Sequence, residues 1–233
     1  MSIPDVAEKW STAVNTVVIG ATADNGGTRG STVTLGGTGA LPFLGFEGST
    51  GQKPAIAVEV WDAETDTWPD ALKEIYGDAI NSPAEWAKKG VEFGADLILL
   101  RLVGAHPDSA DHSPEQCAQT VKDVLAAVDV PVAIWGCGVD EKDNEILPAV
   151  SAAAKGENCL IGTAREKNYR TLVAVCLADN HKLIAESPLD INIAKQVNIL
   201  CSDAGFDLQN IVMFPTTGAL GYGIEYVYSI QER

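Results

Sequence analysis

The sequence predicts an α/β fold in which short parallel strands alternate with helices. Brief, continuous apolar runs recur along the chain after Pro54, and such runs are typical of parallel strands that are buried on both faces. Helix start signals lie between these runs, and each strand–helix unit takes about 30 residues, the length of a βαβ repeat. With 46% hydrophobic residues in 233, the chain can bury one sizeable core. The predicted strands lie at residues 55–61, 97–102, 130–135, 159–161, 183–185 and 211–214.

The first part of the chain departs from this repeat. Residues 16–21 and 31–36 are rich in β-branched residues, which favour strands. Asp24-Asn25-Gly26-Gly27 lies between them and is a strong turn signal. We therefore predict a β-hairpin outside the strand–helix repeat.

A Gly-rich stretch at residues 36–51 follows this hairpin and is predicted as a loop. Its apolar anchors would be residues 41–43 and Phe46. The chain is thus expected to divide into an N-terminal β-hairpin and Gly-rich extension, residues 1–53, and a strand–helix region, residues 54–233.

Several helices carry explicit start signals. Ser82 is predicted as an N-cap, with Pro83 at the first helical position, and Ser113 repeats this device. Asp190 is predicted to cap a later helix. Because proline is disfavoured inside helices, we place Pro148 as the first residue of a helix that runs to residue 156. Another helix is expected to end near residue 180, and the one after Asp190 near residue 205.

Two architectures accommodate these units, an open doubly wound sheet and a closed barrel. No Gly-x-Gly-x-x-Gly motif follows the first predicted parallel strand, which weakens a dinucleotide-binding open sheet. A TIM (β/α)8-type barrel usually takes roughly 250 residues. Only about six βα units are present, and residues 230–233 lie inside a helical pattern. We therefore predict a TIM-type barrel that is C-terminally incomplete.

Charge and cysteine content argue against two classes of binding partner and indicate the cellular compartment. There are 16 basic and 32 acidic residues, a formal net charge of −16, which argues against nucleic acid and against an anionic membrane surface as partners. No apolar run reaches the length of a membrane span. The five cysteines form no Cys-x-x-Cys pair and are typical of reduced thiols in a cytoplasmic protein.

Function in such folds lies where strands end and loops lead into the following helices. Small, mostly uncharged polar groups dominate these positions, which suits hydrogen bonding to a large polar molecule better than acid–base chemistry. The sequence contains no evident catalytic residue and no metal-binding cluster, so the chain's status as an enzyme stays open. The candidate cofactor-binding residues are His106, Gly136, Cys137, Gly138, Asn168, Asn192, Thr216, Thr217 and Gly218.

Two of these residues, His106 and Cys137, also allow a catalytic or metal-binding interpretation, which we do not favour. His106 has no second His or Cys nearby, so we expect a loop hydrogen-bonding residue rather than a general base or metal ligand. Cys137 lies between two glycines without an apparent His partner, so we expect a small residue in a tight turn rather than a nucleophile.

Four motifs make the chain resemble a known family. They lie at residues 40–48, 136–143 and 187–192, and in Pro215-Thr216-Thr217-Gly218-Ala219-Leu220-Gly221-Tyr222-Gly223 with its continuation to Tyr226. The chain resembles the small subunit of the corrinoid iron–sulfur protein, which is equivalent to the delta subunit of acetyl-CoA decarbonylase/synthase. The resemblance spans residues 26–233.

This resemblance implies a TIM barrel that pairs with a large subunit, which carries a 4Fe-4S cluster and a corrinoid (cobalamin) domain. The corrinoid would lie at the interface, against the C-terminal mouth of the barrel. The complex would carry a methyl group from methyltetrahydrofolate and its methyltransferase to acetyl-CoA synthase / carbon monoxide dehydrogenase, in the reductive acetyl-CoA (Wood–Ljungdahl) pathway of carbon fixation.

Two other functions remain open. One is a free-standing pterin-binding TIM-barrel methyltransferase, in which Asp62, Asn168 and Asn192 would bind the ring. The other is a purely structural interaction module, whose barrel mouth a partner would cover without any ligand.

Overall fold

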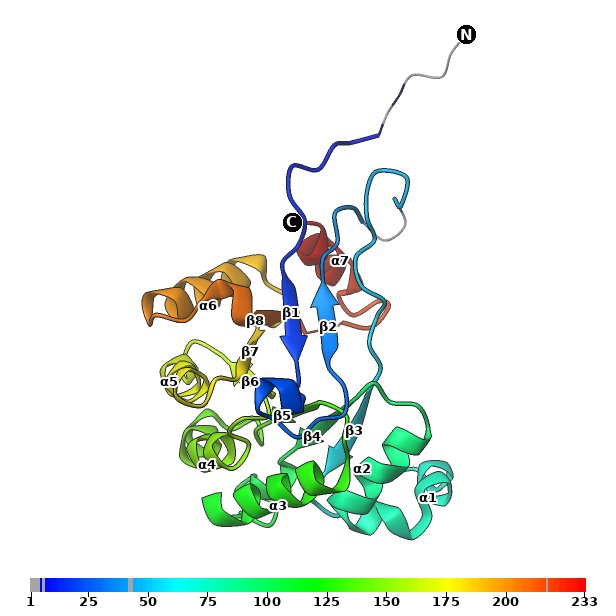
Figure 1. Ribbon diagram of the computed structural model, residues 1–233, viewed down its shortest axis with the longest axis vertical. Coiled ribbons are helices and arrows are strands. Elements are labelled where there is room, and N and C mark those ends of the chain that lie inside the picture. Colours follow the sequence, from blue (N-terminus) through cyan, green and yellow to red (C-terminus); the bar gives the residue numbers. More distant parts are fainter. Residues whose placement is uncertain (1–4, 6, 42–43, 217) are drawn as a thin grey trace.

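Six strands run parallel in the central sheet, and their order across the sheet is their order along the chain (Figure 1). This computed structural model describes residues 5, 7–41, 44–216 and 218–233. The sheet strands are β3 (Ala57–Trp61), β4 (Leu97–Arg101), β5 (Val132–Trp135), β6 (Leu160–Ala164), β7 (Lys182–Glu186) and β8 (Ile211–Phe214). The helices are α1 (Asp70–Tyr76), α2 (Pro83–Glu92), α3 (Pro114–Ala127), α4 (Asp140–Ala153), α5 (Tyr169–Asp179), α6 (Ile191–Asp203) and α7 (Ile224–Glu232).

The strand order distinguishes this sheet from a doubly wound one. A doubly wound sheet reverses its strand order at a switch point, whereas here β3 to β8 follow one another without reversal. Neighbouring strands end together, since Trp61 pairs with Arg101 and Arg101 pairs with Trp135. The carboxyl ends of the strands therefore form one continuous edge, which we call the strand-end edge.

The two faces of the sheet have different coverings. Because side chains alternate along a strand, Ile98 and Leu100 point to the helices and join Val121 and Val124 of α3 in the main core. Leu97, on the other face, belongs to a second cluster of buried residues. Helices α3 to α6 lie in a row along one side of the sheet (Figure 1).

A hairpin of β1 (Thr16–Ile19) and β2 (Val33–Gly36) covers the second face, and the predicted antiparallel pairing is confirmed. Val17 and Ile19 pack there with Leu97. Of the predicted loop anchors that follow, Pro42 and Phe43 lie outside the described residues. Phe46 is 68% exposed, so its assignment as an anchor is wrong.

Arg29 attaches the segment between β1 and β2 to the loops that precede β5 and β6. Its guanidinium donates to the Glu157 carboxylate at 2.7 Å and to the carbonyl oxygens of Val128 and Leu125 at 2.6 and 2.7 Å. Asn158 adds amide bonds to the carbonyl oxygens of residues 18 and 20. The hairpin is therefore held at the amino ends of the strands, away from the strand-end edge.

Three of the predicted helix start signals are confirmed. Ser82 caps α2, Ser113 forms a capping box with Gln116 at the start of α3, and Asp190 caps α6. The helix predicted to end near residue 180 also ends there, with Asn180 in the left-handed region at φ 60°.

The helix start predicted at Pro148 is wrong, because this proline lies inside α4. An interior proline costs about 3 kcal/mol, since it removes one helix hydrogen bond. Ile146, Leu147 and Val150 are fully buried on both sides of it. Burial of each such side chain contributes about 1.5–3 kcal/mol, and this packing offsets the lost bond.

The capping box of α3 gives a measurable prediction. Replacing Ser113 by alanine removes the acceptor of the Gln116 N–H and is expected to lower the free energy of unfolding by about 1 kcal/mol. Urea unfolding monitors the change. Ser202→Ala, at an exposed position of α6, is the matched control and is expected to change stability by less than about 0.5 kcal/mol. Equal losses in both variants would contradict a capping role.

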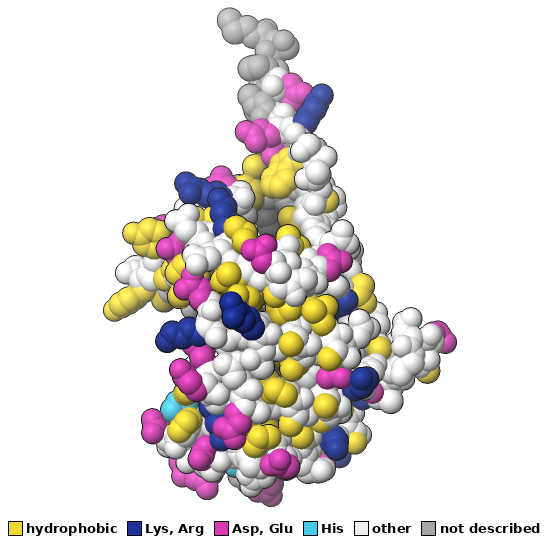
Figure 2. Space-filling view, turned by 90° about the vertical axis from the view of Figure 1, so that its left-hand side faces the viewer, with side chains coloured by type: hydrophobic (Ala, Val, Ile, Leu, Met, Phe, Trp, Pro, Cys, Tyr) yellow, Lys and Arg dark blue, Asp and Glu magenta, His cyan; other side chains and the backbone are white. Residues whose placement is uncertain are grey.

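Figure 2 shows the side of the molecule on which α4, α5 and α6 lie. Lysine and arginine side chains on this side are scattered among acidic ones and form no basic patch. Binding of nucleic acid requires clustered positive charge, so this side offers no such surface. Among the described residues, no helix is both long and apolar enough to cross a bilayer.

Candidate functional site

Arg101, the last residue of β4, lies at the strand-end edge. Its Nη1 lies 3.1 Å from a carboxylate oxygen of Glu59. Its guanidinium carbon lies 5.9 Å from the ring centroid of Trp61 and 5.7 Å from that of Trp135. A guanidinium between two indole rings is held by cation–π attraction as well as by its ion pair. Arg101 therefore has a fixed orientation.

A second arginine lies at the end of β6. Arg165 is paired with Glu186 at 2.6 Å and with Asp140 at 3.3 Å. Thr163 donates its hydroxyl to the same Glu186 oxygen at 2.6 Å, and Thr216 approaches the other oxygen at 3.5 Å. The ends of β6, β7 and β8 are thereby joined by one network of charged and hydroxyl groups.

The loop after β5 is built around Asp143. The N–H of Cys137 donates to one carboxylate oxygen at 2.7 Å, and the N–H of Gly138 donates to the other at 3.2 Å. Burial raises the pKa of Asp143, and these donors partly compensate. A Cβ on Gly136 would collide with the carboxylate, so this position requires glycine. The N–H groups of residues 137 and 138 hold this carboxylate.

Cys137 is a half-buried thiol in that loop. Burial raises its pKa to about 11. The thiolate is the nucleophilic form, and at neutral pH this side chain is protonated. The position and protonation state of Cys137 thus agree with the expected small residue in a tight turn.

Asn168 holds the loop after β6. Its Oδ1 accepts the N–H of Arg165 at 2.7 Å, and its Nδ2 donates to the carbonyl of Thr163 at 3.0 Å. The side chain is 1% exposed. Asn168 therefore positions Thr163 and Arg165.

The remaining candidate residues lie around the rim of the strand-end edge. His106 accepts the N–H of Asp108 at 3.1 Å, as expected of a loop hydrogen-bonding residue. Asn192 is exposed in the first turn of α6. Thr216 adopts a positive φ of 42°. Gly218 is half-buried, and a Cβ there would lie 2.7 Å from the Tyr222 carbonyl oxygen. Thr217 lies outside the described residues.

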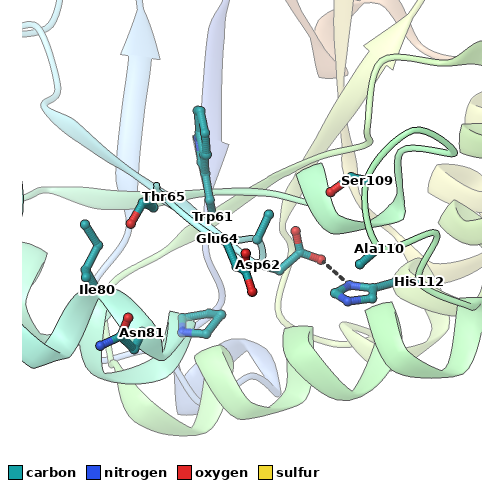
Figure 3. A pocket seen from close by; sticks show the side chains of 11 residues that line it. Trp61, Asp62, Glu64, Thr65, Ile80, Asn81, Ser109, Ala110 and His112 are labelled. Carbon is teal, nitrogen blue, oxygen red and sulfur yellow. Dashed lines mark hydrogen bonds and ion pairs between the residues drawn. The ribbon is translucent and has the colours of Figure 1, made fainter. Parts of the chain in front are cut away.

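A larger cavity of about 700 Å³ lies beside this edge, between the loops that follow β3 and β4 (Figure 3). On its wall Asp62 accepts the N–H of Gly104 at 2.7 Å and lies 3.2 Å from Nδ1 of His112. A Cβ on Gly104 would collide with the His112 ring, so glycine is required there. Asp62 thus orients a histidine at the cavity wall.

The expectation of a mainly uncharged site is wrong. Glu59, Arg101, Arg165 and Glu186 provide ion pairs at the strand-end edge. The sequence of β4 already indicated a charged side chain at this edge. Arg101 follows Leu97 and Leu99 at spacings of two, so it shares their face of the sheet. Among the described residues, no group of three or more His, Cys, Asp or Glu could hold a metal ion.

Comparison with known proteins identifies the family. The family described as CO dehydrogenase/acetyl-CoA synthase delta subunit matches residues 16–233. The chain belongs to this delta subunit family. Acetyl-CoA decarbonylase/synthase complex subunit delta 1 of Methanosarcina thermophila is 38% identical over 99% of this chain and 53% of its own length. The delta subunit of Methanocaldococcus jannaschii is 37% identical over 97% of this chain and 56% of its own length.

A further delta subunit, that of Archaeoglobus fulgidus, is 36% identical over 97% of this chain and 50% of its own length. The chain therefore spans about half the length of the curated delta subunits that it matches. The resemblance inferred from the sequence motifs is confirmed at the level of the family, and the relatives are named as subunits of a multi-subunit complex.

Proposed function

We propose that this chain is the small subunit of a heterodimeric corrinoid iron–sulfur methyl carrier, with its strand-end edge facing the corrinoid. The complex would carry a methyl group from methyltetrahydrofolate to acetyl-CoA synthase. Membership of the delta subunit family supports the complex. The observation that carries the location is the presence of two ion pairs at this one edge, Arg101 with Glu59 and Arg165 with Glu186.

We also propose that residues 54–233 are part of a TIM (β/α)8 barrel and that residues 1–53 are an extension. The unreversed parallel order of β3 to β8 supports the barrel. So does the separation of the faces, with helices on one side and the hairpin on the other. In this proposal the strand-end edge is part of the barrel mouth, where function lies in this architecture.

The residues at the edge fit a corrinoid. Asn192 offers an exposed side-chain amide, and one Glu186 oxygen has only the long contact from Thr216 at 3.5 Å, while the corrinoid periphery is rich in polar amide groups. When bound, the corrinoid supplies the cobalt that holds the methyl group. In this proposal the chain's residues bind and orient the periphery.

The 4Fe-4S cluster is assigned to the large subunit in this proposal. Four of the five cysteines are buried and the fifth is half-buried. Such a cluster takes four thiolates at one place, while burial raises the pKa of Cys117 and Cys159 to about 12. These thiols therefore suit packing rather than cluster binding.

A free-standing pterin-binding methyltransferase has less support. Both the oxygen and the nitrogen of the Asn168 side-chain amide form hydrogen bonds with the backbone of its own loop. The Asp62 carboxylate is occupied by Gly104 and His112. Of the three residues that would bind a pterin ring, only Asn192 is exposed.

Co-purification with the candidate large subunit tests the proposal. We expect an equimolar complex whose visible absorption shows corrinoid and iron, and we expect the corrinoid to be lost when this chain is removed. A stable monomer that binds methyltetrahydrofolate without a partner would contradict the subunit assignment.

A matched pair of variants on α6 locates the corrinoid. Asn192→Trp adds bulk at the strand-end side of the helix, and Asp203→Trp adds the same bulk at an exposed position at its other end. Only the first is expected to lower corrinoid retention. Equal retention in both would remove Asn192 from the interface.

A further inference from the structure

The cavity of about 700 Å³ beside the strand-end edge has the size of a binding site, since such sites usually measure roughly 300–1,000 Å³. Three segments form its walls: the loop after β3, residues 80–83 at the start of α2, and the loop after β4. In Figure 3, Thr65 lies toward Ile80 and Asn81, and His112 lies with Ser109 and Ala110. The polar groups of these walls indicate what the cavity binds.

Thr65 carries an unpaired hydroxyl on the wall of this cavity. The residue is only 8% exposed, and its Oγ1 forms no hydrogen bond with any described residue. Buried hydroxyl groups normally have a partner. The oxygen is not one of the polar atoms that are sealed from solvent, so a group that enters the cavity can reach it.

His112 presents a second unpaired atom. Its Nδ1 lies 3.2 Å from a carboxylate oxygen of Asp62, whose side chain is 2% exposed. Because an ionised carboxylate can only accept, Nδ1 donates the hydrogen bond and the ring is held in place. Nε2 has no partner among the residues that the structure describes, and it too is open to solvent. The imidazole therefore offers one free ring nitrogen at the cavity wall.

The wall of the cavity is negatively charged in either protonation state of His112. Asp62 and Glu64 contribute two carboxylates, and the imidazole contributes at most one positive charge. Within the described part of the chain, no lysine or arginine lines the cavity, and the exposed Glu64 forms no ion pair. The wall therefore repels an anion and attracts a cation.

An organic cation fits this wall better than a metal ion does. The described residues provide no group of three or more His, Cys, Asp or Glu that could hold a metal. Trp61, Ile80 and Pro83 add apolar surface to the wall. The methylene stem of a lysine or arginine side chain covers such surface while its charged end meets a carboxylate. A basic side chain therefore matches both the charge and the apolar part of the cavity.

We propose that this cavity receives a lysine or arginine side chain of the large subunit. Glu64 supplies the opposite charge, and Oγ1 of Thr65 and Nε2 of His112 accept N–H groups of the incoming side chain. The inference rests on the proposed function, in which the adjoining strand-end edge faces the corrinoid and hence the large subunit. The net charge of −16 also favours a partner with a basic surface.

Association of this chain with the large subunit, measured at low and at high salt, tests the inference. Glu64→Gln keeps the shape of the side chain and removes its charge. It is expected to weaken association about tenfold at low salt, or about 1.4 kcal/mol, and the difference from the wild type is expected to shrink as salt is added. Asp66→Asn is the matched control, because Asp66 is exposed on the same loop but does not line the cavity. This control is expected to change association less than about twofold.

Thr65→Val tests the hydroxyl without a change of charge. Valine has nearly the same shape as threonine but cannot accept an N–H, so association is expected to weaken several-fold. Thr67→Val is the matched control, since Thr67 is exposed two residues further on and does not line the cavity. It is expected to associate as the wild type does. Thermal melting of each variant alone verifies that the chain folds.

Three results would overturn the inference. Equal weakening by Glu64→Gln and Asp66→Asn would show a general attraction between charged surfaces, so the cavity assignment would be wrong while the proposed function stands. A lower melting temperature of the isolated Glu64→Gln chain, with association unchanged, would mean that the carboxylate serves a group of this chain. If no complex forms with the large subunit, the proposed function itself fails, and the inference with it.

Discussion

Replacing Arg29 by methionine is expected to lower the free energy of unfolding by about 3–5 kcal/mol, the cost of removing one partner from a buried ion pair. Arg29 is 4% exposed and donates to Glu157, Val128 and Leu125. Methionine fills similar space but leaves the carbonyl oxygens of Val128 and Leu125 without this donor, and it leaves the Glu157 carboxylate with its bonds from Thr28 but without a counter-charge. Urea unfolding followed by tryptophan fluorescence measures the loss.

Arg29→Lys is the informative control. It keeps the positive charge but lacks the planar fork that reaches several acceptors at once, so an intermediate loss is expected. Lys88→Met, at an exposed position on α2, is expected to have little effect. A loss below about 1 kcal/mol for Arg29→Met would mean that the hairpin is attached mainly by its apolar contacts.

The stability of the protein is expected to fall as the pH decreases below about 6.5, because His181 is buried as the neutral imidazole. Nδ1 accepts the N–H of Cys159 at 3.2 Å, so Nε2 carries the proton and donates to the carbonyl of Ser151 at 3.0 Å. Burial lowers the pKa of His181, although the Ser151 carbonyl and Asp179 oppose this and Lys155 adds to it.

The direction of this change in stability follows from the number of protons that His181 binds in the folded and unfolded states. A base with a lowered folded-state pKa binds fewer protons folded than unfolded, so the stability present above the unfolded pKa is lost as the pH falls through it. One such group changes the free energy of unfolding by up to about 1.4 kcal/mol per pH unit. The loss stops once the pH is below the lowered folded pKa.

His181→Gln isolates this contribution. It is expected to be less stable than the wild type near pH 7.5, and the difference between the two is expected to shrink between about pH 6.5 and pH 5. His106→Gln, on the loop after β4, controls for loss of a histidine elsewhere and is expected to follow the wild-type profile. Parallel profiles for the wild type and His181→Gln would refute the assignment.

Local signals in the sequence were sufficient for most of the elements. Ser113 and Asp190 cap helices through bonds to residues two or three positions away, so nearby sequence determines them. Pro148 was misplaced because the packing of Leu147 and Val150 against other elements outweighs a local penalty. No local sequence pattern indicates such contacts between distant segments of the chain.

The strand ends were predictable from the sequence, but the ion pairs between them were not. Gly136 and Gly138 were found because glycines after a predicted strand are a local signal. The pairing of Arg165 with Glu186, 21 residues apart, depends on the alignment of β6 with β7. The buried Nε of Arg101 and Nε1 of Trp135 have no hydrogen-bond partner among the described residues. Such a lack of partners depends on the packing of distant segments and cannot be read from the sequence.

The docking of the hairpin has a consequence for the order of folding. Asn15 donates to the carbonyl of Gln209, a contact across 194 residues, and β1 packs on strands as distant as β7. Contacts of such long range slow folding, because the chain must close large loops before they form. During synthesis the hairpin emerges before the strands of the sheet and has no surface to pack on until they are made. We therefore expect it to dock late, as the step that completes the native core.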